Sequence, residues 1–118
     1  MLDSTARVID VLEELLEATR SARSALAVNE ELIARSVEML RSGGEIADMM
    51  HAEPIGDQRQ ATQDALDRVN AARHQLRLSV VAACVEAGMT PREIAEEWDM
   101  SRQRVDQFVQ KLKRAPTD

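Results

Sequence analysis

Apolar residues recur along the first third of the chain at alternating steps of four and three, which collects them on one side of a helix. Small and polar residues interrupt this stripe, so it favours packing within a helical bundle over a strong parallel leucine zipper. Its members are Val8, Leu12, Leu15, Thr19, Ala22, Leu26, Asn29, Ile33, Ser36 and Leu40, widened by Ile9, Leu16 and Val37. We expect one helix from about Ser4 to Arg41, capped by Asp3 or Ser4; the alternative is a break near Val28, with Asn29 capping a second helix.

Glycine and proline punctuate the middle of the chain. Ser42, Gly43 and Gly44 are expected to end the first helix, and residues 54–56 interrupt the chain again. Between these breaks, residues 45–51 predict a short helical turn. Asp57 is expected to cap a second long helix that continues to Gly88 and packs antiparallel on the first. Its apolar positions are Ala61, Ala65, Leu66, Val69, Ala72, Leu76, Val80, Ala83 and Cys84.

The stretch from residue 90 to 109, TPREIAEEWDMSRQRVDQFV, predicts two short helices joined by a tight turn. Thr90 and Glu93 have the spacing of a capping box, and Pro91 suits the first helical position because its missing N–H costs nothing there. The first helix should run to about Trp98. Ser101 should cap the second, which continues to about Arg114.

This stretch resembles a helix-turn-helix, in which the second helix enters the major groove of DNA. The small side chain of Ala95 suits the close approach of two steeply crossing helices. The inward residues would be Ile94, Ala95, Trp98, Met100, Val105 and Phe108. Residues 100–109, MSRQRVDQFV, are similar to the recognition helix of sigma-factor region 4 and of small bacterial transcriptional regulators, and the resemblance covers residues 76–114. One departure is Asp99, which stands where the family usually has a glycine with positive φ.

The chain is therefore expected to be all-α, with a long helical hairpin followed by a C-terminal helix-turn-helix. Its 118 residues include few Gly and Pro, one Trp, one Phe and no Tyr, a composition that makes a β-sandwich improbable. Residues 1–56 would form a helical dimerisation arm. Residues 57–118 would form a long helix followed by the helix-turn-helix DNA-binding domain.

The net charge of −6 is unevenly distributed. Residues 1–53 carry five Arg against eleven Asp and Glu, which accounts for the whole imbalance. Residues 101–114 contain five Arg and Lys against Asp106 alone, a local charge of +4. A basic helix at one end of an otherwise acidic chain indicates where nucleic acid would bind.

The second helix of the pair carries the candidate DNA-binding residues. Arg bridges guanine O6 and N7, and Gln pairs with adenine N6 and N7. We expect base readout from Arg102, Gln103, Asp106 and Gln107. We expect phosphate contacts from Ser101, Arg104, Lys111 and Arg114, assisted by Thr90 and Arg92.

Other chemistry has little support in the sequence. Trp98 and Phe108 could stack on single-stranded bases, but their positions favour the core. His51 and His74 lack the spacing of zinc ligands, and Cys84 lies on an apolar helical face with no basic neighbour, which favours a small buried residue over a redox sensor. The carboxylates of residues 93–99 favour a solvated face. Because no phosphate loop, catalytic triad or cofactor motif occurs, we expect neither an enzyme nor a bound cofactor.

The most favoured function is a sequence-specific, double-stranded DNA-binding transcriptional regulator. We expect a cytoplasmic homodimer, joined through residues about 5–42, whose recognition helices enter major grooves about 34–36 Å apart. A single cysteine and the lack of a membrane-spanning stretch agree with that location and with no membrane partner. The alternative is a protein-interaction module whose acidic arm binds RNA polymerase or another regulator, or an antitoxin-like protein with both ends active. Its working surface would be Glu13, Glu14, Glu17, Glu30, Glu31 and Glu38.

Overall fold

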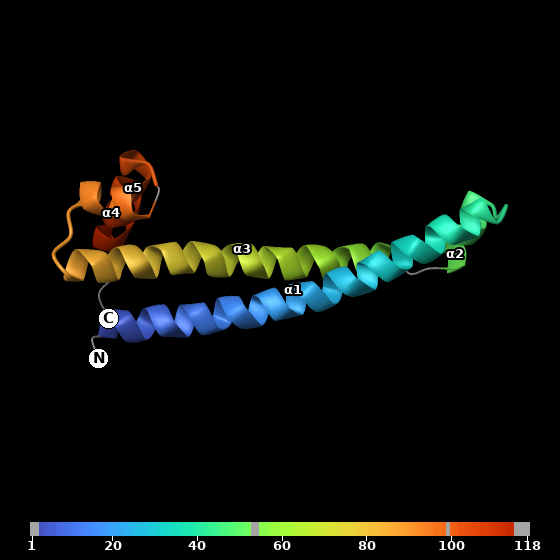
Figure 1. Cartoon of the computed structure of the whole chain (residues 1–118), viewed down its shortest axis with the longest axis horizontal. Helices are drawn as coiled ribbons and strands as arrows, with labels where there is room; N and C mark the ends of the chain where they lie inside the picture. Colours follow the sequence, from blue (N-terminus) through green and yellow to red (C-terminus); the bar gives the residue numbers. More distant parts are fainter. Residues whose placement is uncertain (1–2, 53–54, 99, 115–118) are drawn as a thin grey trace. The chain divides into compact units, whose positions relative to one another are not determined.

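The computed structural model describes residues 3–52, 55–98 and 100–114, and every regular element in these ranges is a helix (Figure 1). The chain is all-α, as its composition and periodicity predicted. The helices are α1 Asp3–Arg41, α2 Ile46–Ala52, α3 Ile55–Glu86, α4 Pro91–Glu97 and α5 Arg102–Arg114.

The first helix is continuous, which confirms one helix rather than two broken near Val28. Asp3 and Ser4 already lie within α1, so neither is its cap. At the other end Gly43 adopts a φ of 93°, and the Gly44 N–H donates to the Met39 carbonyl at 3.0 Å. Glycine is required at this turn because residues with a Cβ rarely adopt such a positive φ.

The second long helix begins earlier than predicted. Since α3 already includes Ile55, Asp57 lies in its first turn and is not the cap. Its carboxylate still suits this position, because the first turn of a helix favours negative charge. The helix ends at Glu86, and Gly88 in the turn that follows has a φ of 90°, with the Met89 N–H donating to the Cys84 carbonyl at 3.0 Å.

The chain forms two compact units, each of which draws on both long helices. The terminal unit consists of Met1–Leu15 with Ala72–Asp118, and the central unit of Leu16–Ala71. These boundaries differ from the predicted division at residue 56.

In the central unit, α1 packs through its small side chains. Ala18 and Ala22 are buried with Leu32, and Gln58 of α3 donates from Nε2 to the Ala25 carbonyl at 3.1 Å. The predicted stripe is therefore wrong at every second position. The large residues of the predicted set lie exposed beside this seam and are called here the outer stripe: Leu16, Leu26, Ile33, Val37 and Leu40. Alanines allow two helix backbones to approach closely, and this excludes the larger side chains next to them.

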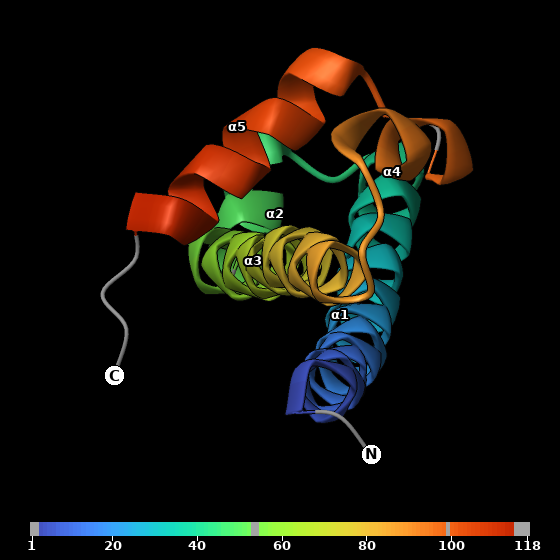
Figure 2. The same ribbon diagram turned by 90° about the vertical axis from the view of Figure 1, so that its left-hand side faces the viewer.

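In the terminal unit, α5 crosses over the C-terminal end of α3, with α4 beside it (Figure 2). One apolar cluster lies where these three helices meet. Its buried members are Val81, Ile94, Ala95, Val105 and Phe108, and Leu78, Cys84, Met89, Met100, Val109 and Leu112 pack against it.

Candidate nucleic-acid interface

The start of α4 is fixed by the predicted capping box. The Thr90 hydroxyl accepts from the Glu93 N–H at 3.2 Å, and a Glu93 carboxylate oxygen accepts from the Thr90 N–H at 3.0 Å. The bond from the Thr90 N–H, and after it the Thr90 hydroxyl beside the carboxylate, hold the pKa of Glu93 below its ordinary value. The N–H, the hydroxyl oxygen and the carbonyl of Thr90 are thus all hydrogen-bonded to the first turn of α4. The Arg92 guanidinium lies 3.4 Å from Glu96, so its charge is partly compensated in this exposed pair.

The start of α5 is fixed in a similar way. Ser101 caps it as predicted, because its hydroxyl accepts from the Arg104 N–H at 3.1 Å, and the Ser101 carbonyl accepts from the Val105 N–H at 3.1 Å. Behind this start, Val105 and Phe108 are buried against Ile94. The cap sets where α5 begins, and the core sets which of its faces remains outside.

The residues predicted to read bases share the exposed side of α5. Arg102, Gln103, Asp106 and Gln107 are all exposed, and none has a hydrogen-bond or ion-pair partner among the described residues. Gln110 is exposed on the same side, since it follows Gln103 by seven residues, about two helical turns. The prediction covered only the first two turns of the helix and did not include Gln110, although the helical period of 3.6 residues places it on this side.

Two of the predicted phosphate-binding residues lie on the flank of α5 that faces α3. The Arg104 guanidinium is 5.9 Å from the centre of the Phe108 ring. Lys111 Nζ is 3.2 Å from His74 Nε2. The His74 and Phe108 rings are 5.7 Å apart. Arg114, near the end of the helix, is exposed and has no such contact among the described residues.

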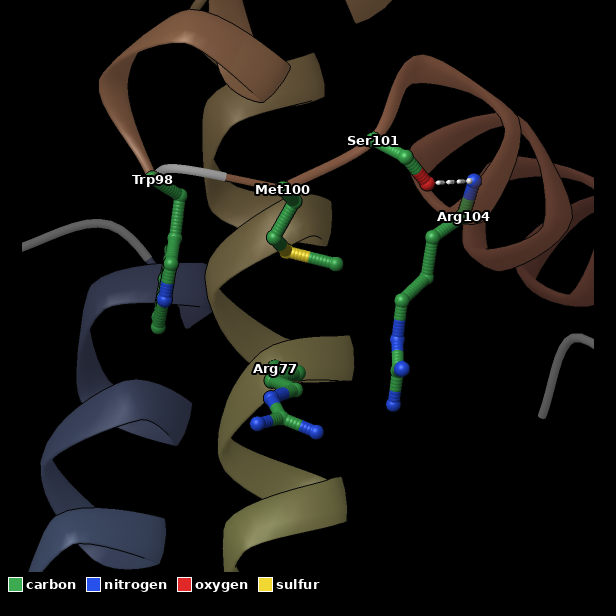
Figure 3. Close-up of a pocket in the computed structure, with 5 residues that line it drawn as sticks. All are labelled: Arg77, Trp98, Met100, Ser101 and Arg104. Carbon is green, nitrogen blue, oxygen red and sulfur yellow. Dashed lines mark hydrogen bonds between the residues drawn. The ribbon is translucent and has the colours of Figure 1, made fainter.

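The prediction that Trp98 belongs to the core is wrong. Trp98 terminates α4 and is only half-buried, and it lines a pocket of about 330 Å³ with Arg77, Met100, Ser101 and Arg104. Figure 3 shows the side chains of Trp98, Arg77 and Arg104 extending to the same side of the turn, with Met100 between them. Met100 and Phe108 do join the core as predicted. Arg77 was not predicted, because only the crossing of α3 and α5 brings it near the turn. Asp99 lies outside the described residues.

The remaining candidates for chemistry lie apart from one another. His51 Nδ1 is 2.6 Å from the Ala47 carbonyl within α2. Cys84 is half-buried, and burial raises the pKa of its thiol. No three His, Cys, Asp or Glu side chains cluster as a metal site within the described ranges. In the same part of the chain, no helix has the length and apolar character needed to cross a membrane.

Comparison with known proteins gives no relative: no family model, curated protein or solved structure matches the chain.

Proposed function

We propose that the chain is a sequence-specific, double-stranded DNA-binding transcriptional regulator that acts as a homodimer, with the end of α3, α4 and α5 as its helix-turn-helix. The observation that carries this proposal is the exposed side of α5. There, Arg102 and three glutamines, at 103, 107 and 110, have no partner among the described residues, while the opposite side of the helix is buried. Because packing along one side holds the helix in place, its other side can enter a groove without further ordering of the backbone.

The chemistry of this side suits DNA bases. A guanidinium reads guanine through O6 and N7, and a carboxamide reads adenine through N6 and N7. Asp106 can accept from the cytosine amino group, and its negative charge discourages binding at positions without such a donor. The basic residues of α5 supply the attraction to phosphates that precedes base reading.

Homodimerisation is supported by the outer stripe of α1. Leu16 is 50% exposed and Ile33 is 52% exposed, although both are large apolar residues at heptad spacing. Ile33, Val37 and Leu40 also line an apolar hollow of about 370 Å³ in the central unit, together with Met49 of α2. Such a surface is costly in water, and a second copy offers an equally spaced stripe to cover it.

The charges within the outer stripe favour a second copy in antiparallel orientation. Arg23 and Glu30 lie between the members of the outer stripe, at steps of seven from Leu16 and Val37, and both are exposed. A parallel pair would place each beside its own counterpart, which repels. An antiparallel pair with Leu16 opposite Val37 places Arg23 of one copy opposite Glu30 of the other and keeps the two Arg23 residues about two turns apart.

Selection of bound DNA from a random-sequence duplex pool, at two salt concentrations, tests the function. We expect enrichment of a two-fold symmetric site and a steep loss of affinity with salt. The half-site spacing then measures the separation of the two recognition helices. Enrichment of no sequence would contradict the proposal, and the acidic residues of α1 would become the next surface to test.

A pair of substitutions tests base reading directly. Arg102→Ala should weaken binding to the selected site by about 1–3 kcal/mol and relax the preference at one base pair. Arg114→Ala is the matched control, because removing a phosphate-binding charge there should weaken binding to all sequences equally and lower the salt slope by about one. Unchanged affinity and preference in Arg102→Ala would remove Arg102 from the base-reading set.

A further inference from the structure

We propose that the pocket between α3, the turn after α4 and the start of α5 binds a phosphate group. Its five lining residues come from three places in the sequence that the fold of the terminal unit brings together: Arg77, Trp98, Met100, Ser101 and Arg104. Figure 3 shows the two guanidinium groups approaching this space from α3 and from α5.

The two arginines have no counter-ion in the part of the chain that the structure describes. Within the described ranges, neither Arg77 nor Arg104 lies within ion-pairing distance of a carboxylate. Arg77 is also half-buried, so it has lost part of its hydration, and no carboxylate among the described residues pairs with it in return. Two like charges beside one pocket repel each other, and an anion between them removes that repulsion.

The neighbouring groups add donors and an apolar wall. The Ser101 hydroxyl oxygen already accepts from the Arg104 N–H, which leaves its own O–H free to donate into the pocket. Ser101 also stands at the N-terminus of the 13-residue α5, where the helix dipole favours negative charge. The half-buried Trp98 indole and the Met100 thioether offer a surface for the organic part of a phosphate ester.

A phosphate fits these donors better than a carboxylate does. Each guanidinium forms a planar fork that binds two oxygens, and the hydroxyl requires a further acceptor. A carboxylate has only two oxygens and one charge, so it can bind one guanidinium group through both oxygens but leaves the other with few hydrogen bonds. A phosphate provides more acceptors and up to two charges, and it can therefore engage both arginines together.

The phosphate could belong to the DNA backbone or to a free phosphorylated molecule. The pocket includes Ser101 and Arg104 of α5, so a free phosphate ester bound there would compete with a DNA phosphate at the same helix. Only the DNA source depends on the proposed function. Binding of inorganic phosphate does not, so the two proposals can fail separately.

The single tryptophan gives a direct probe of the pocket. In ¹⁵N-labelled full-length protein, the Trp98 indole N–H should give one peak, which we expect to shift saturably with sodium phosphate. Sodium chloride at matched ionic strength and pH should leave it in place. Arg77→Gln, and independently the exposed Arg104→Gln, should weaken the phosphate response by about tenfold or more.

Arg73→Gln is the matched control, because Arg73 is exposed one turn before Arg77 on α3 and does not line the pocket. The same change in charge there should alter the response by less than about threefold. An equal loss in all three variants would indicate diffuse attraction and overturn the proposal. A wild-type peak that moves no more with phosphate than with chloride would also overturn it.

A second arm identifies the source of the phosphate. If the DNA backbone occupies the pocket, Arg77→Gln should weaken binding to all duplexes equally and lower the salt slope by about one, whereas Arg73→Gln should not. If phosphate shifts the indole peak while Arg77→Gln leaves DNA affinity unchanged, the ligand is a free phosphorylated molecule. If the protein binds no DNA but the phosphate response depends on Arg77, the pocket proposal stands without the proposed function.

Discussion

Thr90 is the residue whose local role is most sharply defined. Its side chain accepts from the Glu93 N–H, one of the donors that a helix start leaves unsatisfied. Thr90→Ala should therefore lower the free energy of unfolding by about 0.5–2 kcal/mol, measured by urea denaturation followed by circular dichroism. Thr90→Ser keeps the hydroxyl and should lose much less. Equal losses in the two variants would show that the Thr90 methyl group, rather than the cap, stabilises α4.

Glu93 gives the same capping box a dependence on pH. The bonds from Thr90 lower the pKa of the carboxyl below its ordinary value of 4.5. A lowered pKa in the folded state means that this stabilisation is complete above pH 4.5 and is lost as the pH falls through the folded value. Glu93→Gln keeps an acceptor oxygen and removes the titration. The stability difference between wild type and this variant, measured by urea denaturation, should therefore shrink as the pH falls below about 4.5.

Other carboxylates titrate over the same range, so the comparison uses the difference between the two proteins rather than either acid transition alone. A difference that stays constant from neutral pH to the acid limit would contradict a lowered pKa at Glu93. Glu97→Gln provides a matched control, because Glu97 lies on the same helix outside the capping box and has no ion-pair partner among the described residues.

At the residue scale, interactions between residues close in the sequence were predictable, and those between distant residues were not. The capping box and the Ser101 cap depend on residues three apart, and the sequence alone predicted both of them. The environment of Trp98 depends on where α3 passes the turn, which no local pattern encodes. An apolar position near a helix end was therefore assigned to the core, although the structure leaves it beside two arginines.

At the scale of elements, α1 shows why helical periodicity is ambiguous. Two overlapping stripes share the steps of four and three along this helix, and hydrophobicity alone favours the one with larger residues. The structure buries the one that contains Ala18 and Ala22. The existence and continuity of α1 were predictable from its pattern. The face that packs was not, because close helix approach rewards small side chains.

Ala18 tests this close packing. It is fully buried, so Ala18→Leu adds three heavy atoms where no space exists, and it should destabilise the protein by about 1–3 kcal/mol. Ala27→Leu adds the same atoms at an exposed position of α1 and should change stability by less than about 0.5 kcal/mol. Thermal and urea unfolding measure both variants. If Ala18→Leu is as stable as the wild type, α1 and α3 can move apart at this position without a loss of folding free energy.

At the scale of the whole molecule, the separation of charge was readable from the sequence and agrees with the exposed basic side of α5. The surface proposed for dimerisation was only partly predictable from the sequence. Residues about 5–42 were predicted to join the dimer, and exposed apolar residues do lie in this range. They include Leu26 and Ile33, which belong to the stripe that was expected to pack within the helical bundle. Their exposure strengthens the case for a second copy, because more apolar surface remains to be covered.

Ile33 is the residue at which the dimer is tested. It is 52% exposed, lines the apolar hollow of the central unit and occupies the middle of the outer stripe. Ile33→Glu should leave the helical content unchanged, since the side chain faces solvent within one copy. It should also move the protein to a monomer in sedimentation at tens of micromolar, because a buried unpaired carboxylate opposes association. Ala34→Glu adds the same charge one residue later at an exposed position outside the stripe, and it should remain a dimer.

The orientation of the pair is tested by exchanging its charges. In the antiparallel arrangement, Arg23→Glu places two carboxylates near each other across the interface and should weaken the dimer, whereas adding Glu30→Arg in the same chain restores opposite signs and should recover it. In a parallel pair, the double change only swaps one repulsive contact for another, so no recovery is expected. A wild-type protein that sediments as a monomer would remove both arrangements and would leave the outer stripe to a different partner.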